Sequence, residues 1–130
     1  MILGLDHVNL RTEQLDVMIA WYEETLQLKR GPRPSFGFPG AWLYAGDAPL
    51  VHLSEVDTAR PGGTDLTLEH AAFRAKGMAE FVARLEAGGQ RYRLSPVPDF
   101  PTVQVNIWDP DGNHLHVDFG RDEAEAAGLV

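Results

Sequence analysis

Polar and apolar residues alternate along several short segments of the chain, which is the pattern of strands with one buried face. In residues 4–11, Val8 and Leu10 fall on one face, while His7 and Asn9 fall on the other. We therefore expect half-buried strands wherever this two-residue period occurs. It occurs again in residues 67–74, 102–108 and 114–119.

Two other segments repeat apolar residues every three or four positions, which predicts amphipathic helices. The first ends near residue 27, and Thr12 is a candidate N-cap before it. The second is closed by Gly88 and Gly89, which favour a helix C-cap. The apolar positions are Leu15, Met18, Ile19, Tyr22 and Leu26 in the first helix and Met78, Phe81, Val82 and Leu85 in the second.

The remaining segments are shorter or less regular. Residues 29–40 contain three prolines, which cannot donate to a strand ladder, so a loop or an irregular strand is expected there. Residues 56–65 lack periodicity and contain a Pro-Gly-Gly tripeptide, which indicates a linker. Residues 120–130 are acidic and rich in alanine, and we expect a short helix or a frayed tail. Short strands are expected at 41–45, 50–54 and 91–94.

The two halves of the chain repeat the same order of elements: a strand, a helix and three further strands. Residues 5–11 align with residues 68–74 at an offset of 63. Residues 51–53 align with residues 115–117 at an offset of 64. The chain therefore contains two copies of one module.

This order predicts an α+β protein with two βαβββ modules, about residues 4–55 and 66–119, in a single domain that spans residues 1–130. If the helices cover the apolar faces, the polar faces of the two mixed sheets can curl around a central cleft. A chain of 130 residues has the length of one ordinary domain.

Four of the five histidines belong to two repeat-related pairs, His7 with His70 and His52 with His116. Each lies on the more polar side of its strand, so all four imidazoles can point into one cleft. As ordinary core residues they would need four separate hydrogen-bond partners. One shared metal ion would satisfy them together, and imidazole suits Zn, Fe, Ni, Cu or Co. The fifth, His114, shares the face of His116 but has no repeat partner, and we interpret it as a rim or supporting residue.

Composition and charge narrow the range of partners. The formal net charge is −8, which argues against a general nucleic-acid binder, because phosphate contacts need clustered lysine and arginine. The chain has no cysteine, which excludes thiolate metal sites and thiol catalysis. It shows no signal-peptide pattern and no apolar run long enough to span a membrane, so we expect no membrane association and a cytoplasmic location.

Four motifs resemble those of a known family. They are Leu-Asp-His-Val at 5–8, Trp-Tyr-x-x-x-Leu at 21–26, Leu-Glu-His at 68–70 and Asp-Pro-Asp-Gly-Asn-x-x-His at 109–116. Together with the repeated module, they make the chain similar to the vicinal oxygen chelate superfamily over residues 4–119. This superfamily contains glyoxalase I, extradiol dioxygenases, fosfomycin- and bleomycin-resistance proteins and methylmalonyl-CoA epimerase.

The resemblance implies a divalent metal ion (Fe, Ni, Co, Mn or Zn) held by His7, His52, His70 and His116. Glyoxalase-like members usually have glutamate where this chain has His52 and His116. In those members the glutamate is a ligand and, in the isomerases, also the base for proton transfer. Four neutral imidazoles leave the 2+ charge uncompensated, which should favour anionic substrates that bind through two oxygens. Four ligands leave two positions open on an octahedral ion but none on tetrahedral zinc.

Other polar residues are candidates for proton transfer and for substrate binding. Asp118, two residues from His116 on the same face, is the candidate catalytic base. Three arginines could hold an anionic substrate, or could be solvated charges at strand edges. The candidate substrate-binding residues are Arg11, Arg74, Arg93, Asn106 and Trp108.

The sequence supports two functions. The favoured one is a metal-dependent enzyme acting on a small oxygen-rich substrate, either as a lyase or isomerase or as an Fe(II) dioxygenase. The alternative is a metal-free small-molecule binding protein of the bleomycin-resistance type, with an aromatic cleft formed by Trp42, Tyr44 and Trp108. The resemblance also implies a homodimer.

Overall fold

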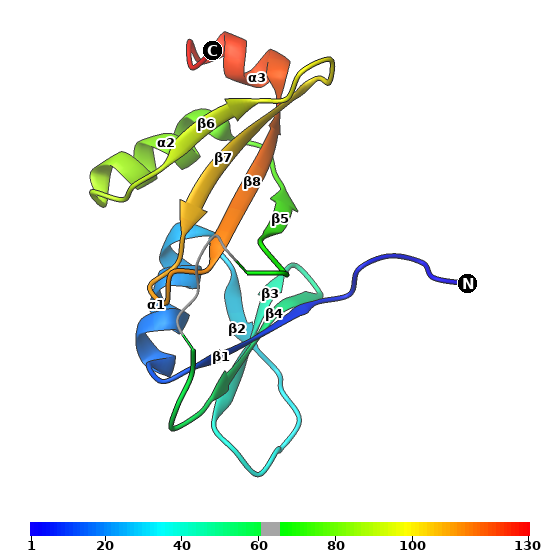
Figure 1. The fold of residues 1–130 in the computed structure, drawn as a ribbon, viewed down its shortest axis with the longest axis vertical. Helices are drawn as coiled ribbons and strands as arrows, with labels where there is room; N and C mark the ends of the chain where they lie inside the picture. Colours follow the sequence, from blue (N-terminus) through cyan, green and yellow to red (C-terminus); the bar gives the residue numbers. More distant parts are fainter. Residues whose placement is uncertain (61–65) are drawn as a thin grey trace. The chain divides into compact units, whose positions relative to one another are not determined.

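The structure, a computed structural model, describes residues 1–60 and 66–130. It divides into two compact units, Met1–Pro61 and Gly62–Val130, which we call the N-terminal and C-terminal modules. Each module contains one four-stranded sheet (Figure 1). The predicted linker at 56–65 lies partly outside the described residues.

The N-terminal module has a mixed sheet with one helix packed against it (Figure 1). Its elements are β1 (Val8–Thr12), α1 (Leu15–Thr25), β2 (Lys29–Gly31), β3 (Gly40–Ala45) and β4 (Ala48–Glu55). The strand order is β1-β4-β3-β2. Strands β1 and β4 are parallel, and the other neighbours are antiparallel.

The C-terminal module repeats this topology. Its elements are β5 (Ala71–Arg74), α2 (Met78–Ala87), β6 (Arg93–Pro96), β7 (Thr102–Trp108), β8 (His114–Gly120) and an added helix, α3 (Arg121–Ala126). The strand order is β5-β8-β7-β6, again with one parallel pair, β5 and β8. The predicted α+β class with two βαβββ modules is confirmed, and the acidic tail forms a short helix.

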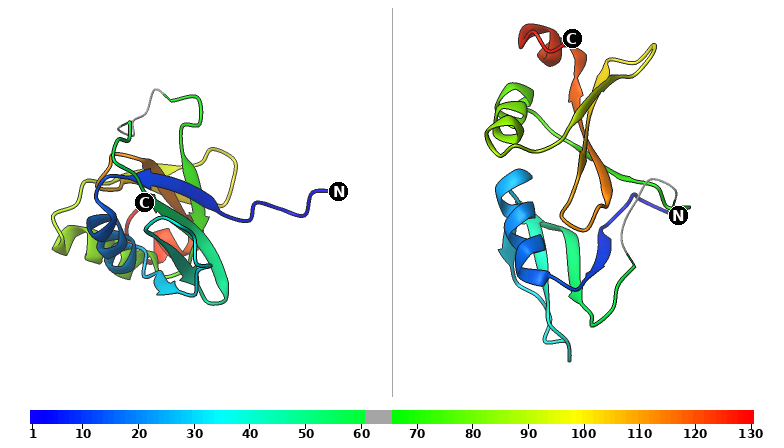
Figure 2. Two further views of the ribbon diagram at one scale, coloured as in Figure 1. Left: turned by 90° about the horizontal axis from the view of Figure 1, so that it is seen from below. Right: turned by 60° about the vertical axis from the view of Figure 1, so that its left-hand side comes forward.

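Apolar faces of helices and strands form a core in each module. In the N-terminal module, Met18 and Tyr22 of α1 and Leu43 of β3 are fully buried. Figure 2 shows α1 running along one face of that sheet. In the C-terminal module, the ring of Phe81 on α2 lies 5.5 Å from the ring of Phe119 on β8. Burying each large apolar side chain contributes about 1.5–3 kcal/mol, so these contacts hold the helices on the sheets.

The strand register places repeat-related residues at equivalent positions in the two sheets. His52 on the inner strand β4 pairs with Trp42 on β3. Its counterpart, His116 on the inner strand β8, pairs with Asn106 on β7. Repeat-related histidines therefore occupy equivalent central positions in the two sheets.

The other two predicted ligands lie outside the strands that were expected to contain them. Strand β1 begins at Val8 and β5 begins at Ala71, so His7 and His70 each come one residue before a strand. Their side chains are consequently not held by strand pairing at their own positions.

The predicted N-cap at Thr12 is wrong. Thr12 is the last residue of β1 and is fully buried, and the N-cap of α1 is Gln14. The hydroxyl oxygen of Thr12 accepts a hydrogen bond from the backbone N–H of Gln14 at 3.1 Å. Thr12 therefore stabilises the connection between strand and helix instead of capping the helix.

The proline-rich segment 29–40 begins with a regular strand. Lys29–Gly31 pairs antiparallel with β3 before Pro32 interrupts the ladder. Across residues 1–60 and 66–130, no helix is long and apolar enough to cross a membrane.

We predict that Met18→Ala lowers the free energy of unfolding by about 2–5 kcal/mol, because it leaves a cavity between α1 and its sheet. The neighbouring Val17 is 49% exposed, so Val17→Ala is the matched control and should change stability by less than about 0.5 kcal/mol. Urea unfolding followed by circular dichroism measures both. Equal losses in the two variants would contradict the packing of α1 described here.

Candidate metal centre

Each module brings its two predicted metal-binding histidines together. In the N-terminal module the rings of His7 and His52 are stacked, with centroids 3.8 Å apart and planes 11° from parallel. In the C-terminal module the ring centroids of His70 and His116 are 4.4 Å apart. The cause is the same in both modules, because the first strand of each runs parallel to the last strand of the same module.

His52 is buried between two rings. His7 covers one side, and Trp42 stacks with a centroid distance of 4.0 Å and an interplanar angle of 13°. The Nε2 of His52 lies 3.1 Å from the carbonyl oxygen of Pro49. A carbonyl only accepts, so Nε2 carries the proton and Nδ1 keeps its lone pair. Burial, and then the nearby His7, lower the pKa of His52, which favours the neutral form that a metal ion requires.

His116 is held by an acid on its own strand. Its Nδ1 lies 2.5 Å from Oδ1 of Asp118, and the side chain is 6% exposed. The carboxylate accepts, so Nδ1 donates and Nε2 is left as the lone-pair nitrogen. Metal-binding histidines typically donate their other ring N–H to a carboxylate or carbonyl in this way.

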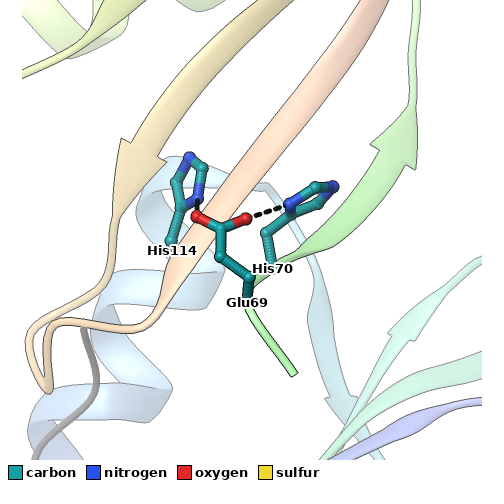
Figure 3. Close-up of side chains that lie close together, drawn as sticks. All are labelled: Glu69, His70 and His114. Atoms are coloured by element: carbon teal, nitrogen blue, oxygen red, sulfur yellow. Dashed lines mark hydrogen bonds and ion pairs between the residues drawn. The ribbon is translucent and has the colours of Figure 1, made fainter. Parts of the chain in front are cut away.

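A third group of ligand-type side chains lies in the C-terminal module (Figure 3). Glu69, His70 and His114 each offer one ligand atom, and these atoms lie within 4.8 Å of one another. Oε1 of Glu69 accepts from Nδ1 of His114 at 2.7 Å, and Oε2 accepts from Nδ1 of His70. Hydrogen bonds from His70 and then His114 lower the pKa of Glu69. Glu69 is therefore a carboxylate shared by two imidazoles.

His114 has a second partner that fixes its ring. Its Nε2 donates to Oδ1 of Asn106 at 2.9 Å. The amide nitrogen of Asn106 donates at 3.2 Å to the carbonyl oxygen of Arg93 and at 3.2 Å to the hydroxyl of Ser95. These bonds settle which end of the amide faces His114. His114 and Asn106 are both buried, so the ring is held in place by the body of the sheet.

The turn before β8 places His114. The buried carboxylate of Asp109 accepts from the backbone N–H groups of Asp111 at 3.0 Å and Asn113 at 2.9 Å. Its other oxygen accepts from the side-chain amide of Asn113 at 2.8 Å. Gly112 has φ +84°, a left-handed conformation that glycine adopts without strain. The Asp-Pro-Asp-Gly-Asn motif thus forms a hydrogen-bonded turn that leads directly into His114.

The predicted substrate-binding arginines and Trp108 lie in two kinds of position. The three arginines are exposed on edge strands, namely Arg11 on β1, Arg74 on β5 and Arg93 on β6. Such positions fit solvated charges at sheet edges. Trp108 is half-buried, stacks on His114 at 5.3 Å, and has the guanidinium of Arg91 3.7 Å from its ring centroid.

Sequence reasoning missed one residue and underestimated another. Glu69 was not considered as a site residue. His114 was expected at a rim, yet it is 8% exposed and bonded on both sides. The signal for Glu69 was the repeated acid-histidine pair, Asp6-His7 and Glu69-His70. In both pairs the acid contacts Nδ1 of the histidine that follows it, at 2.7 Å in the case of His7.

Comparison with known proteins identifies the family. Residues 4–117 match the family model described as the Glyoxalase/Bleomycin resistance protein/Dioxygenase superfamily. The chain belongs to this superfamily. The predicted resemblance is thereby confirmed, and members of the superfamily typically bind a divalent metal ion and a small-molecule substrate. No curated protein matches the sequence.

Solved structures with this fold come from several bacteria. A glyoxalase family protein from Bacillus anthracis has a TM-score of 0.77 and 22% identity, covering 92% of this chain and 97% of that one. The fosfomycin resistance protein FosX from Listeria monocytogenes has a TM-score of 0.70 and 18% identity, covering 92% and 95%. Lactoylglutathione lyase from Agrobacterium tumefaciens has a TM-score of 0.69 and 19% identity, covering 93% and 96%. At these identities the likeness establishes the fold alone.

We predict that His52 titrates below its ordinary pKa of 6.5 in chelator-treated protein. The folded chain then resists protonation at His52 while the unfolded chain accepts it. Stability from this group is therefore complete above pH 6.5 and is lost as the pH falls through the lower, folded pKa. NMR titration of the imidazole signals measures this, and His7→Asn should raise the midpoint of His52. A midpoint at or above 6.5 would contradict the buried, stacked position.

Proposed function

We propose that this protein binds a divalent metal ion through its histidines and uses it to bind and transform a small, oxygen-rich substrate. The observation that carries the proposal is the pre-set orientation of the imidazoles. In each module a buried histidine has one ring nitrogen occupied by an oxygen acceptor, and the other nitrogen is left with a lone pair. The arrangement leaves one lone-pair nitrogen at the equivalent position of each repeat, which is the form of histidine that binds a metal ion.

The proposed ligands are the repeat-related histidines. His70 and His116 come from the C-terminal module, and His7 and His52 come from the N-terminal module. That all four bind one ion follows from the repeat and the family resemblance, and it stays a prediction. The proposed ion is Fe, Ni, Co, Mn or Zn, and among these imidazole ligands suit Fe, Ni and Zn well.

A bound 2+ ion would polarise substrate oxygens and lower the pKa of bound water. The protein's own residues would orient the ligands and attract the substrate. The exposed arginines Arg11, Arg74 and Arg93 are proposed to attract an anionic substrate. The amide of Asn106 is already bonded to His114 and Arg93, which supports a role in orienting His114 over direct contact with substrate.

The reaction class remains part of the proposal. Isomerase or lyase chemistry needs a base, and Asp118 is the candidate near His116. An Fe(II) dioxygenase would instead need the ion and oxygen. We also retain the homodimer and the cytoplasmic location as predictions.

A metal-free binding protein is the second candidate, and an aromatic cluster favours it. Trp42 stacks on His52, and Phe36 lies 6.4 Å from Trp42 and 5.5 Å from Phe38. Both phenylalanines are about half-exposed, and the guanidinium of Arg33 lies over them at 4.9 and 5.0 Å. Such a surface could bind a flat organic molecule. A ligand affinity that is insensitive to chelators would support this candidate over the metal-dependent one.

We predict that anaerobically purified protein retains a divalent transition metal that EDTA removes and that added metal restores. His70→Ala should weaken binding by at least about tenfold, since it removes a ligand. Lys76→Ala, at an exposed position in the same module, is the control and should bind like the wild type. Elemental analysis and calorimetric titration measure both. Wild-type protein that takes up none of Fe, Ni, Co, Mn or Zn would refute the proposal.

We further predict that Asp118→Ala weakens metal binding by about 10–100-fold, because His116 loses the acceptor that fixes its ring. Ser54→Ala is the matched control, since Ser54 occupies the repeat-related position but bonds to Asn9 and not to a histidine. Metal affinity by competition with a chromogenic chelator distinguishes the roles of Asp118. Unchanged affinity with lost turnover would assign Asp118 as the base instead.

A further inference from the structure

The C-terminal module contains a possible ligand set that neither the repeat nor the family resemblance assigns. We propose that Glu69, His70 and His114 form a two-histidine, one-carboxylate site for a divalent first-row transition metal. The site shares only His70 with the four repeat-related histidines, and it rests on the proposed function in that a divalent metal binds at His70.

The spacing of the ligand atoms fits an ion. Two ligand atoms that each lie about 2.1 Å from an ion, at right angles to each other, are about 3 Å apart. Oε1 of Glu69 and Nδ1 of His114 are already 2.7 Å apart, and Oε2 of Glu69 contacts Nδ1 of His70. All three ligand atoms lie within 4.8 Å of one another. Small movements of exposed ends would therefore complete the coordination.

The orientation of His114 is an independent argument. Its Nε2 donates to Oδ1 of Asn106, whose amide is fixed in turn by Arg93 and Ser95. With Nε2 committed as a donor, Nδ1 is the nitrogen that faces Glu69 and can bind metal. A metal ion that binds at Nδ1 would displace any proton there to solvent and would replace the contact with Glu69 by coordination.

The donor set has the charge that the repeat-related histidines lack. Those four positions all hold histidine, so that set brings no negative charge to a metal ion. Glu69, the residue before His70, adds one negative charge to the proposed ligand set of the C-terminal module. Two imidazoles and one carboxylate suit Fe, Mn, Co, Ni or Zn and leave coordination positions open. The side chains of Glu69 and His70 are 38% and 42% exposed, so solvent or substrate oxygens can reach those positions.

The N-terminal module is a built-in comparison. Asp6 contacts His7 as Glu69 contacts His70, but Asp6 is 89% exposed. The residue that corresponds to His114 at the repeat offset of 64 is Leu50, which cannot bind metal. The N-terminal module therefore lacks the third ligand, so the same acid-histidine pair does not form a three-residue group there.

The test is titration of the chelator-treated full chain with Co(II), followed by absorption spectroscopy and by competition for affinity. Glu69→Gln should weaken Co(II) binding by about 10–100-fold or more, and His114→Leu, which installs the residue of the other repeat, should do the same. Glu69→Asp, which keeps the carboxylate, should recover part of the affinity. Glu24→Gln, at an exposed position on α1, is the matched control and should bind like the wild type.

Two further measurements separate ligand loss from misfolding and from indirect effects. Thermal unfolding in chelator should show that each variant folds. X-ray absorption of the Co(II) protein should show one imidazole fewer in His114→Leu than in the wild type. Wild-type affinity and spectra in both Glu69→Gln and His114→Leu would overturn this ligand set and leave the proposed function standing. Wild-type protein that binds no metal would overturn both.

Discussion

In each module, the first strand pairs in parallel with the last strand, and this pairing determines which polar side chains lie together. In the C-terminal module, β5 aligns with β8, so the residues just before β5 lie next to residues on β8 that are about 45 positions later in the chain. This one ladder brings Glu69 and His70 beside His114 and His116. Without it, the contacts of Glu69 and His70 with the histidines of β8 would not form.

The order of elements and the α+β class could be predicted because alternation and helical periodicity directly reflect burial. Residues 102–108 were predicted as a strand and form β7 with the same bounds. The roles of Glu69 and His114 could not be predicted. Glu69 falls in the segment 67–74 that was expected to be a strand, but β5 begins only at Ala71, so the two-residue period does not give its direction. Its bond to His114 spans 45 residues. The predicted N-cap at Thr12 is wrong because the Thr12 hydroxyl accepts a hydrogen bond from Gln14 in the connection between β1 and α1.

Histidine occupies the equivalent positions 52 and 116, and the surroundings of the two rings differ. Burial and a neighbouring imidazole lower the pKa of His52, while an adjacent acid holds His116. Both histidines are buried with one ring nitrogen on an oxygen acceptor, which is a backbone carbonyl for His52 and a carboxylate for His116.

Each sheet takes all its ladder partners from strands of its own module. A substitution in one ladder therefore leaves the backbone hydrogen bonds of the other intact. Equivalent positions in the two sheets can therefore carry different side chains, as residues 50 and 114 do. The N-terminal module has leucine there, while the C-terminal module has a histidine tied to Asn106. The repeated fold thus allows one sheet to carry side-chain chemistry that the other lacks.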